Sequence, residues 1–200
     1  MKKYFLGSAV FALAFGVFLV SAMSASSPRR VFASTLPTPQ PVISIANSID
    51  YILPFPGKVL PDSPFWSLKA LRDKLQYSFT FNKIKKAELA LLFADKRLAS
   101  SKTLFENKKP DIALATLTKA EKYLEIAAGE KTNPEFLVKL ANASLKHRQI
   151  IEEEILPLAP EDAKPEIIRL EMYPKNTYKI CSEVLISLGK PAPKDPFLGH

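Results

Sequence analysis

The sequence predicts an all-α protein, an antiparallel helical bundle with a central helix-turn-helix hairpin, preceded by an extended proline-rich segment. Apolar residues recur three and four positions apart over most of the region 64–188, which is typical of helices that bury one face. Only 6 of the 200 residues are glycine, and no alternating pattern of strands and hairpin turns is present. The 17 prolines cluster ahead of the predicted helices and at their ends. With 47% hydrophobic and 24% charged residues, the composition is that of a globular protein rather than a disordered one.

The first 25 residues have the layout of a secretion signal. Lys2 and Lys3 precede an apolar run from Tyr4 to Val20, and small residues follow it. Cleavage after the small residues is one outcome. Retention as a membrane anchor is the other, because a helix over this segment would reach roughly 33 Å. Either outcome predicts an exported protein, secreted or tethered to the membrane.

Two segments are expected between this signal and the helices. Residues 26–48 are rich in Ser, Thr and Pro and are predicted to form an extended linker. Residues 49–63 are proline-rich but also apolar, and a solvated spacer has no use for such side chains. We expect this second segment to pack along the helices, or to offer part of itself as a docking site. The candidate partner-binding residues are Tyr51, Phe55, Phe65 and Trp66.

Five helices are predicted within an exported domain that spans residues 49–189. They cover about 64–77, 82–107, 110–128, 134–156 and 163–188. Asp62 and Ser63 are candidate N-caps for a first helix that begins at Pro64. Pro174 is expected to bend or divide the last helix, and the tail 190–200 is expected to fray.

The second and third helices carry matching apolar seams. The seam residues are Ile84, Ala87, Leu91, Ala94, Leu98, Ser101 and Phe105, then Ala113, Leu117, Ala120, Leu124 and Ala127. The short turn between the two helices makes them antiparallel neighbours. Segments 91–98 and 117–124 also resemble each other in sequence. The seam and the extended segment together are predicted to form a groove for a peptide or protein.

An ordered set of short motifs resembles a known bacterial family. Its most specific parts are Leu-Pro-Asp-Ser-Pro at 60–64 and Ala-Asp-Lys-Arg-Leu at 94–98, within a stretch from Asp50 to Leu188. The order of motifs is similar to that of the domain of unknown function 5667 family. The resemblance implies an exported α-helical domain with no established activity, so it assigns no catalytic residue.

Side chains that could support catalysis are scarce. One Cys and two His exclude an internal disulfide and leave little material for a metal site. We expect His147 to be structural at the edge of a buried face, with no acidic partner spaced to complete a site, and Cys181 to be a small buried hydrophobe. Glu152 to Glu154 are interpreted as solvated charge. The sequence therefore predicts no enzyme, no cofactor and no metal, and a ligand- or metal-dependent helical enzyme is the least favoured alternative.

The net charge of +8 directs attention to the basic surface. The candidate basic patch consists of Lys83, Lys85, Lys86, Lys108 and Lys109. Such a patch would suit an anionic envelope polymer or a membrane surface, although interleaved acidic residues are typical of an ordinary solvated face. Nucleic acid is not an expected partner, because recognisable binding motifs are missing. The prediction is a binding or structural role in the bacterial cell envelope, with a protein or peptide partner, and adsorption through the basic surface as the alternative.

Overall fold

The structure is a computed structural model that describes residues 49–197. The predicted signal (1–25) and linker (26–48) lie outside the described residues. The elements are α2 (Trp66–Ser78), α3 (Lys83–Glu106), α4 (Pro110–Ala127), α5 (Pro134–Ile150), η1 (Ile151–Ile155), η2 (Leu156–Leu158), α6 (Lys164–Leu170) and α7 (Met172–Ser187). Strands are absent from this described part, so the predicted all-α fold is confirmed. None of its helices combines the length and apolarity that crossing a bilayer requires.

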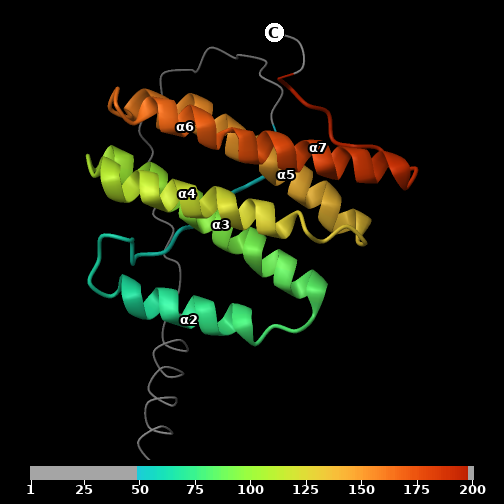
Figure 1. The fold of residues 1–200 in the computed structure, drawn as a ribbon, viewed down its shortest axis with the longest axis horizontal. Helices are drawn as coiled ribbons and strands as arrows, with labels where there is room; N and C mark the ends of the chain where they lie inside the picture. The colour runs from blue at the N-terminus through green and yellow to red at the C-terminus, as the bar shows by residue number, and fades with distance from the viewer. Residues whose placement is uncertain (1–48, 198–200) are drawn as a thin grey trace, which may run out of the picture. The chain divides into compact units, whose positions relative to one another are not determined.

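The antiparallel pair α3 and α4 forms the centre of the domain and makes its most extensive helix–helix packing. The turn between them ends α3 with two hydrogen bonds, from Lys108 N to Phe105 O and from Lys109 N to Leu104 O. Lys108 adopts φ 56°, the left-handed conformation that closes such a turn. Figure 1 shows α2 on one side of this pair and α6 and α7 on the other. The predicted central hairpin is therefore confirmed.

Polar and proline residues define where the central helices begin. Asn82 accepts a hydrogen bond from Lys85 N at the start of α3, and Asn133 accepts one from Phe136 N at the start of α5. Pro110 and Pro134 occupy first-turn positions, where their missing N–H groups have no helical partner to lose.

The first described helix begins later than predicted. It starts at Trp66, and neither Asp62 nor Ser63 caps it in the expected way. Instead, the Asp62 carboxylate lies 2.6 Å from Lys109 Nζ, at the α3–α4 turn. Hydrogen bonding to Lys109 lowers the pKa of Asp62. The ion pair holds the Asp62 side chain away from the start of α2. Residues 61–65 form turns ahead of that helix.

Prolines reshape the last two predicted helices. The helix expected to run to about residue 156 is α-helical only to Ile150. It continues as the wider π-helical turn η1 and ends in the tighter 3₁₀ turn η2. Pro157 has no N–H for the carbonyl of residue 153, which disfavours a continuous α-helix there. The final helix is divided into α6 and α7 at Glu171, three residues before Pro174, for the same reason.

Two buried apolar clusters stabilise the domain. The first includes Leu91, Leu124, Leu137, Leu140 and Leu185, and joins α3, α4, α5 and α7. The second includes Leu98, Leu104, Leu117, Ile151 and Ile167, and joins the other halves of α3 and α4 to η1 and α6. Each fully buried leucine contributes on the order of 2 kcal/mol. The boundary between the clusters crosses the middle of α3, α4 and α5.

The extended segment is held in place through α2. Lys69 Nζ donates hydrogen bonds to Pro56 O at 3.0 Å and to Val59 O at 2.9 Å. Gly57 lies between these acceptors at φ 91°, and a Cβ there would lie 3.4 Å from Lys69 Nζ. The glycine lets the backbone turn around the ammonium group. Partial burial in this loop lowers the pKa of Lys69.

The C-terminal tail makes contacts as far as Phe197, although the sequence predicted fraying from residue 190. Tyr178 donates a hydrogen bond to Pro193 O at 2.6 Å. The guanidinium of Arg148 lies 4.0 Å from the centre of the Phe197 ring. The tail therefore covers parts of α5 and α7.

Candidate functional site

The structure separates the four aromatic residues predicted to bind a partner. Tyr51 and Trp66 are partly buried, and Trp66 lies beneath the Lys69 ammonium at 4.9 Å. Phe55 and Phe65 are 67% and 68% exposed. Phe55 lines an open groove of about 350 Å³ between the extended segment and helices α3 and α5. The α3–α4 seam contributes nothing to that groove, because its residues are buried in the two clusters.

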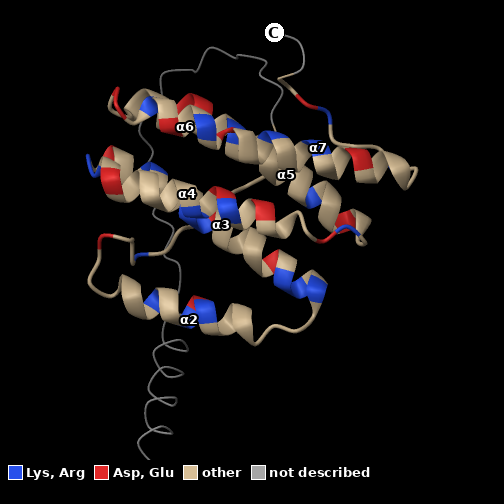
Figure 2. Ribbon diagram, viewed as in Figure 1, with Lys and Arg blue, Asp and Glu red and all other residues tan. Residues whose placement is uncertain are grey.

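The predicted basic patch is also divided. Lys83, Lys85 and Lys86 lie in the first turn of α3, whereas Lys108 and Lys109 follow its last turn. A helix of 24 residues rises roughly 36 Å, so the two groups are at opposite ends. Figure 2 shows basic segments near both ends of α3. These five lysines therefore do not form one continuous surface.

A buried polar network occupies the boundary between the two apolar clusters. Its members, Tyr51, Asp95, Glu121 and His147, are called the His147 network below. His147 Nδ1 lies 2.9 Å from Glu121 Oε1, and Nε2 lies 3.0 Å from Asp95 Oδ1. Tyr51 Oη donates to Asp95 Oδ2 at 2.6 Å. The network therefore joins the extended segment to α3, α4 and α5.

The electrostatics of the network favour a protonated histidine. Burial alone lowers the pKa of His147, but the charges and hydrogen bonds of Glu121 and Asp95 outweigh it and raise the pKa to about 9. The imidazolium then donates both N–H groups to carboxylates and retains no lone pair for a metal. Burial and the Asp95 charge raise the pKa of Tyr51, which keeps its hydroxyl protonated as a donor.

The surroundings of His147 differ from those predicted from the sequence. The residue is fully buried rather than at an edge, and two acidic partners come from other helices. A signal for this was present in the similarity of segments 91–98 and 117–124. Asp95 and Glu121 occupy equivalent positions in those segments, next to the seam residues Ala94 and Ala120.

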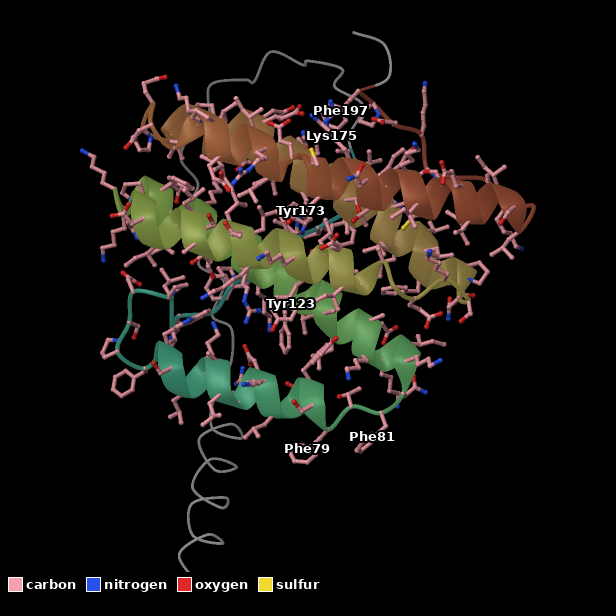
Figure 3. The ribbon with its side chains drawn as sticks, viewed as in Figure 1. Phe79, Phe81, Tyr123, Tyr173, Lys175 and Phe197 are labelled. Carbon is pink, nitrogen blue, oxygen red and sulfur yellow. The ribbon has the colours of Figure 1, made fainter. Side chains whose placement is uncertain are left out.

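A second polar and aromatic cluster lies between α2 and the α3–α4 pair. The Arg97 guanidinium stacks 4.5 Å from the centre of the Tyr123 ring and 5.3 Å from that of Phe93. Tyr77 of α2 meets Tyr123 edge-on at 6.3 Å, and Figure 3 shows Tyr123 reaching from α4 toward α2. Burial lowers the pKa of Arg97, while the charge of Asp73 acts in the opposite direction. The surface beneath α2 is therefore aromatic and cationic.

Helix α2 turns a mixed side with Trp66, Asp73 and Tyr77 inward and leaves its leucines exposed. Asp73 is the most deeply buried residue of α2, at 6% exposure. Leu68, Leu71 and Leu75 are 54%, 53% and 48% exposed. These three leucines, with Phe79 and Phe81 after the helix, are called the α2 outer face. The two phenylalanines are 71% and 88% exposed, and Figure 3 shows them projecting away from the domain.

Another hollow lies on the far side of α4 from α2 and carries charges of both signs. It is an open groove of about 660 Å³ between α4 and the α6–α7 segment, lined by Lys122, Glu125, Glu166, Arg169 and Tyr173 among others. The Arg169 guanidinium and the Glu166 carboxylate form an ion pair. Because charges of both signs line the groove, its charge does not select one class of ligand.

Cys181 and the glutamates occupy ordinary structural environments. Cys181 is fully buried, and burial raises the pKa of its thiol to about 12. Glu152 accepts a hydrogen bond from Arg148 at 2.7 Å, and Glu154 pairs with Lys102. The glutamates are thus part of ion pairs between neighbouring helical segments.

Comparison with known families identifies the central part of this fold. The model of a domain of unknown function (DUF5667) matches residues 58–160, which is half of the chain. The chain belongs to the DUF5667 family. The matched region includes α2 to η2 and three members of the His147 network, whereas Tyr51, α6 and α7 lie outside it. Neither the curated proteins nor the solved structures contain a significant match to the chain.

Proposed function

We propose that this DUF5667 protein is an exported, non-catalytic binding domain of the bacterial cell envelope, with the α2 outer face as its binding surface. The row of exposed leucines on the outer side of α2 is the observation that carries this proposal. Exposed apolar area is unfavourable in water by about 25 cal/mol per Å². A partner that covers Leu68, Leu71 and Leu75 would remove that penalty.

The environment of His147 supports a non-catalytic role. His147 is the described side chain best suited to acid–base chemistry near neutral pH, but it is fully buried. Both of its ring nitrogens are engaged with carboxylates of the same network. This arrangement is suited to joining helices rather than to reaching a substrate.

Support for export comes from the first 25 residues, where two lysines, an apolar run and small residues follow one another. Whether cleaved or retained, such a segment would deliver the domain to the envelope. A binding domain there could act on its own or from a tether.

The binding surface can be tested by capture from a native envelope extract. The full chain is compared with a Leu68→Ser, Leu71→Ser, Leu75→Ser variant, and an Ile126→Ser, Ile168→Ser, Ile186→Ser variant is the control. The control residues are 47%, 54% and 67% exposed and lie on other helices. We expect the α2 variant alone to lose the components that the unmodified chain retains. Equal retention by all three proteins would show that α2 is not the binding surface.

A second candidate function is adsorption of the basic surface to an anionic envelope polymer or lipid through charge alone. It is favoured by the exposure of Lys83 and Lys85 at the start of α3. In that case, capture would be lost at high salt and would be insensitive to the α2 leucine substitutions.

A further inference from the structure

The α2 outer face combines apolar and basic groups in a defined order. At 100° per residue, Leu68, Leu71 and Leu75 fall on one stripe, while Arg72 and Lys74 lie on either side of it. Both basic residues are exposed. The stripe therefore has a cationic border along each edge.

The charge of this region is almost entirely positive. Between Ser63 and Ala87 the chain contains six basic residues and one acidic residue, Asp73. Asp73 is buried and its carboxylate lies 2.8 Å from Arg72, so these two charges offset each other and the positive charge of the region comes from its lysines. Lys83 and Lys85 are exposed just after Phe81 and extend the basic border beyond α2. A partner for this face has to be apolar in its interior and anionic at its rim.

An anionic bilayer has that chemistry, and a second copy of the chain does not. A helix with Leu and Phe on one side and Lys and Arg beside them lies in the headgroup region, with its apolar residues at the acyl boundary. Each Lys or Arg near an anionic surface contributes attraction of its own. In a symmetric dimer through the same face, Arg72 and Lys74 would face the same positive groups.

We infer that the α2 outer face docks on an anionic lipid bilayer, with Leu68, Leu71, Leu75, Phe79 and Phe81 entering the interface and Arg72, Lys74, Lys83 and Lys85 next to lipid phosphates. This inference rests on the proposed function and names the partner of the surface proposed there. The domain then lies with α2 on the membrane and α6 and α7 on the side away from it.

The test needs a local probe, because the N-terminal segment of the full chain could bring the protein to vesicles without α2. Trp66 is the single tryptophan of the chain, which makes such a probe simple to build. A Trp66→Phe, Phe81→Trp chain carries tryptophan on the α2 outer face. A Trp66→Phe, Ile186→Trp chain carries it on α7 as the control. Both replaced sites are exposed, at 88% and 67%.

The measurement is quenching of tryptophan fluorescence by vesicles whose acyl chains are brominated. We expect strong quenching and a blue shift at position 81 with phosphatidylglycerol mixed into phosphatidylcholine, and little with phosphatidylcholine alone. Position 186 should remain unquenched with both. If Trp66→Phe disturbs folding, judged by circular dichroism, the two probes are repeated with Trp66 retained and compared by difference.

Charge variants make the test quantitative. In Lys74→Gln, Lys83→Gln, Lys85→Gln, the ratio of inserted to free α2 should fall on the order of a hundredfold, about fivefold for each charge. The variant Lys179→Gln, Lys190→Gln, Lys194→Gln removes the same net charge from α7 and the tail, and should leave quenching at position 81 unchanged.

Two results would overturn the lipid assignment. One is absence of quenching at position 81 with anionic vesicles. The other is a blue shift that depends on protein concentration and appears without lipid, which would indicate a second copy as the occupant. If either occurred while the α2 leucine variant still lost its envelope partners, the proposed binding surface would stand and only its lipid partner would be wrong.

Discussion

Helices α2 and α4 differ in how far their leucines are buried. In α4, Leu117 and Leu124 are fully buried, as expected for an amphipathic helix on a core. In α2, Asp73 is buried while Leu71 and Leu75 remain about half exposed. Both helices have an apolar side, so the difference arises from what each one packs against. The sequence pattern of a helix specifies two faces, and the surface beneath decides which of them is turned inward.

The surface beneath α2 explains its orientation. Arg97 of α3 and Tyr123 of α4 present a cationic and an aromatic group there, and Tyr77 of α2 packs edge-on against Tyr123. Lys86 Nζ of α3 also lies 4.7 Å from the centre of the Tyr77 ring. A carboxylate such as Asp73 is favourable in this environment, and a leucine in its place would leave the guanidinium of Arg97 without that negative charge.

The largest contrast should appear between two buried carboxylates. Asp95→Asn removes a charge that accepts hydrogen bonds from both Tyr51 and His147, and we expect a loss of about 3–5 kcal/mol in the free energy of unfolding. Asp73→Asn removes a carboxylate paired with the partly exposed Arg72, for which about 1 kcal/mol or less is expected. Denaturant unfolding of the two variants measures this difference. Equal losses would mean that burial alone, and not the network, determines the cost.

A second contrast uses two leucines. Leu124→Ala opens a cavity in the first apolar cluster and should lower the free energy of unfolding by about 3 kcal/mol. Leu71→Ala removes a side chain that is 53% exposed and should change it by about 0.5 kcal/mol or less. Thermal unfolding monitored by circular dichroism provides the comparison. A large loss for Leu71→Ala in the absence of lipid would show that α2 is buried by another part of the protein.

The His147 network should make the free energy of unfolding depend on pH near neutrality. The contacts of α2 should add no such dependence. The folded-state pKa of His147 is raised from 6.5 to about 9, so its stabilisation is complete below the unfolded-state value and is lost as the pH rises through 9. Between pH 6 and 8.5 we expect the free energy of unfolding to fall by about 2 kcal/mol. The measurement is denaturant unfolding over this range.

Two variants control for other titrating groups. In His147→Gln the decrease should disappear, and in Glu121→Gln it should become shallower, because one of the charges that raise the pKa is removed. A decrease of the same size in all three proteins would assign the effect to a different group.

The smallest effect is expected from single hydroxyl groups. Tyr51→Phe leaves one oxygen of the buried Asp95 without its donor, with an expected cost of about 1 kcal/mol. Tyr77→Phe, in α2, keeps the edge-on ring contact and should be close to neutral. Differential scanning calorimetry of the two variants measures this difference. A neutral Tyr51→Phe would exclude a stabilising role for the hydrogen bond from Tyr51 to Asp95.

Periodicity and helix-end residues were sufficient to predict the central fold. Asn133 with Pro134 marks the start of α5 in the sequence, and the α3–α4 seam identifies the hairpin. These features are local or depend on one pair of neighbouring helices. Helix α2 begins two residues after the predicted Pro64, and Asp62 pairs with Lys109, 47 residues away in the sequence, instead of capping it.

The candidate site was less predictable because it depends on distant partners. No spacing within α5 indicates that His147 contacts Asp95 and Glu121, since each acid comes from a different helix. The orientation of α2 was missed for a related reason. Its inner face is selected by Arg97 and Tyr123, whose positions are known only once α3 and α4 have packed.

The hydrogen bond from Tyr51 to Asp95 also has a mechanical consequence. A pulling force transmitted along the chain from the residues before 49 reaches the domain close to Tyr51. That force acts on a side chain bonded to α3 and, through His147, coupled to α4 and α5. The load is thereby shared among three helices that are already packed together, and α2, which follows in the chain, is spared as long as this bond holds.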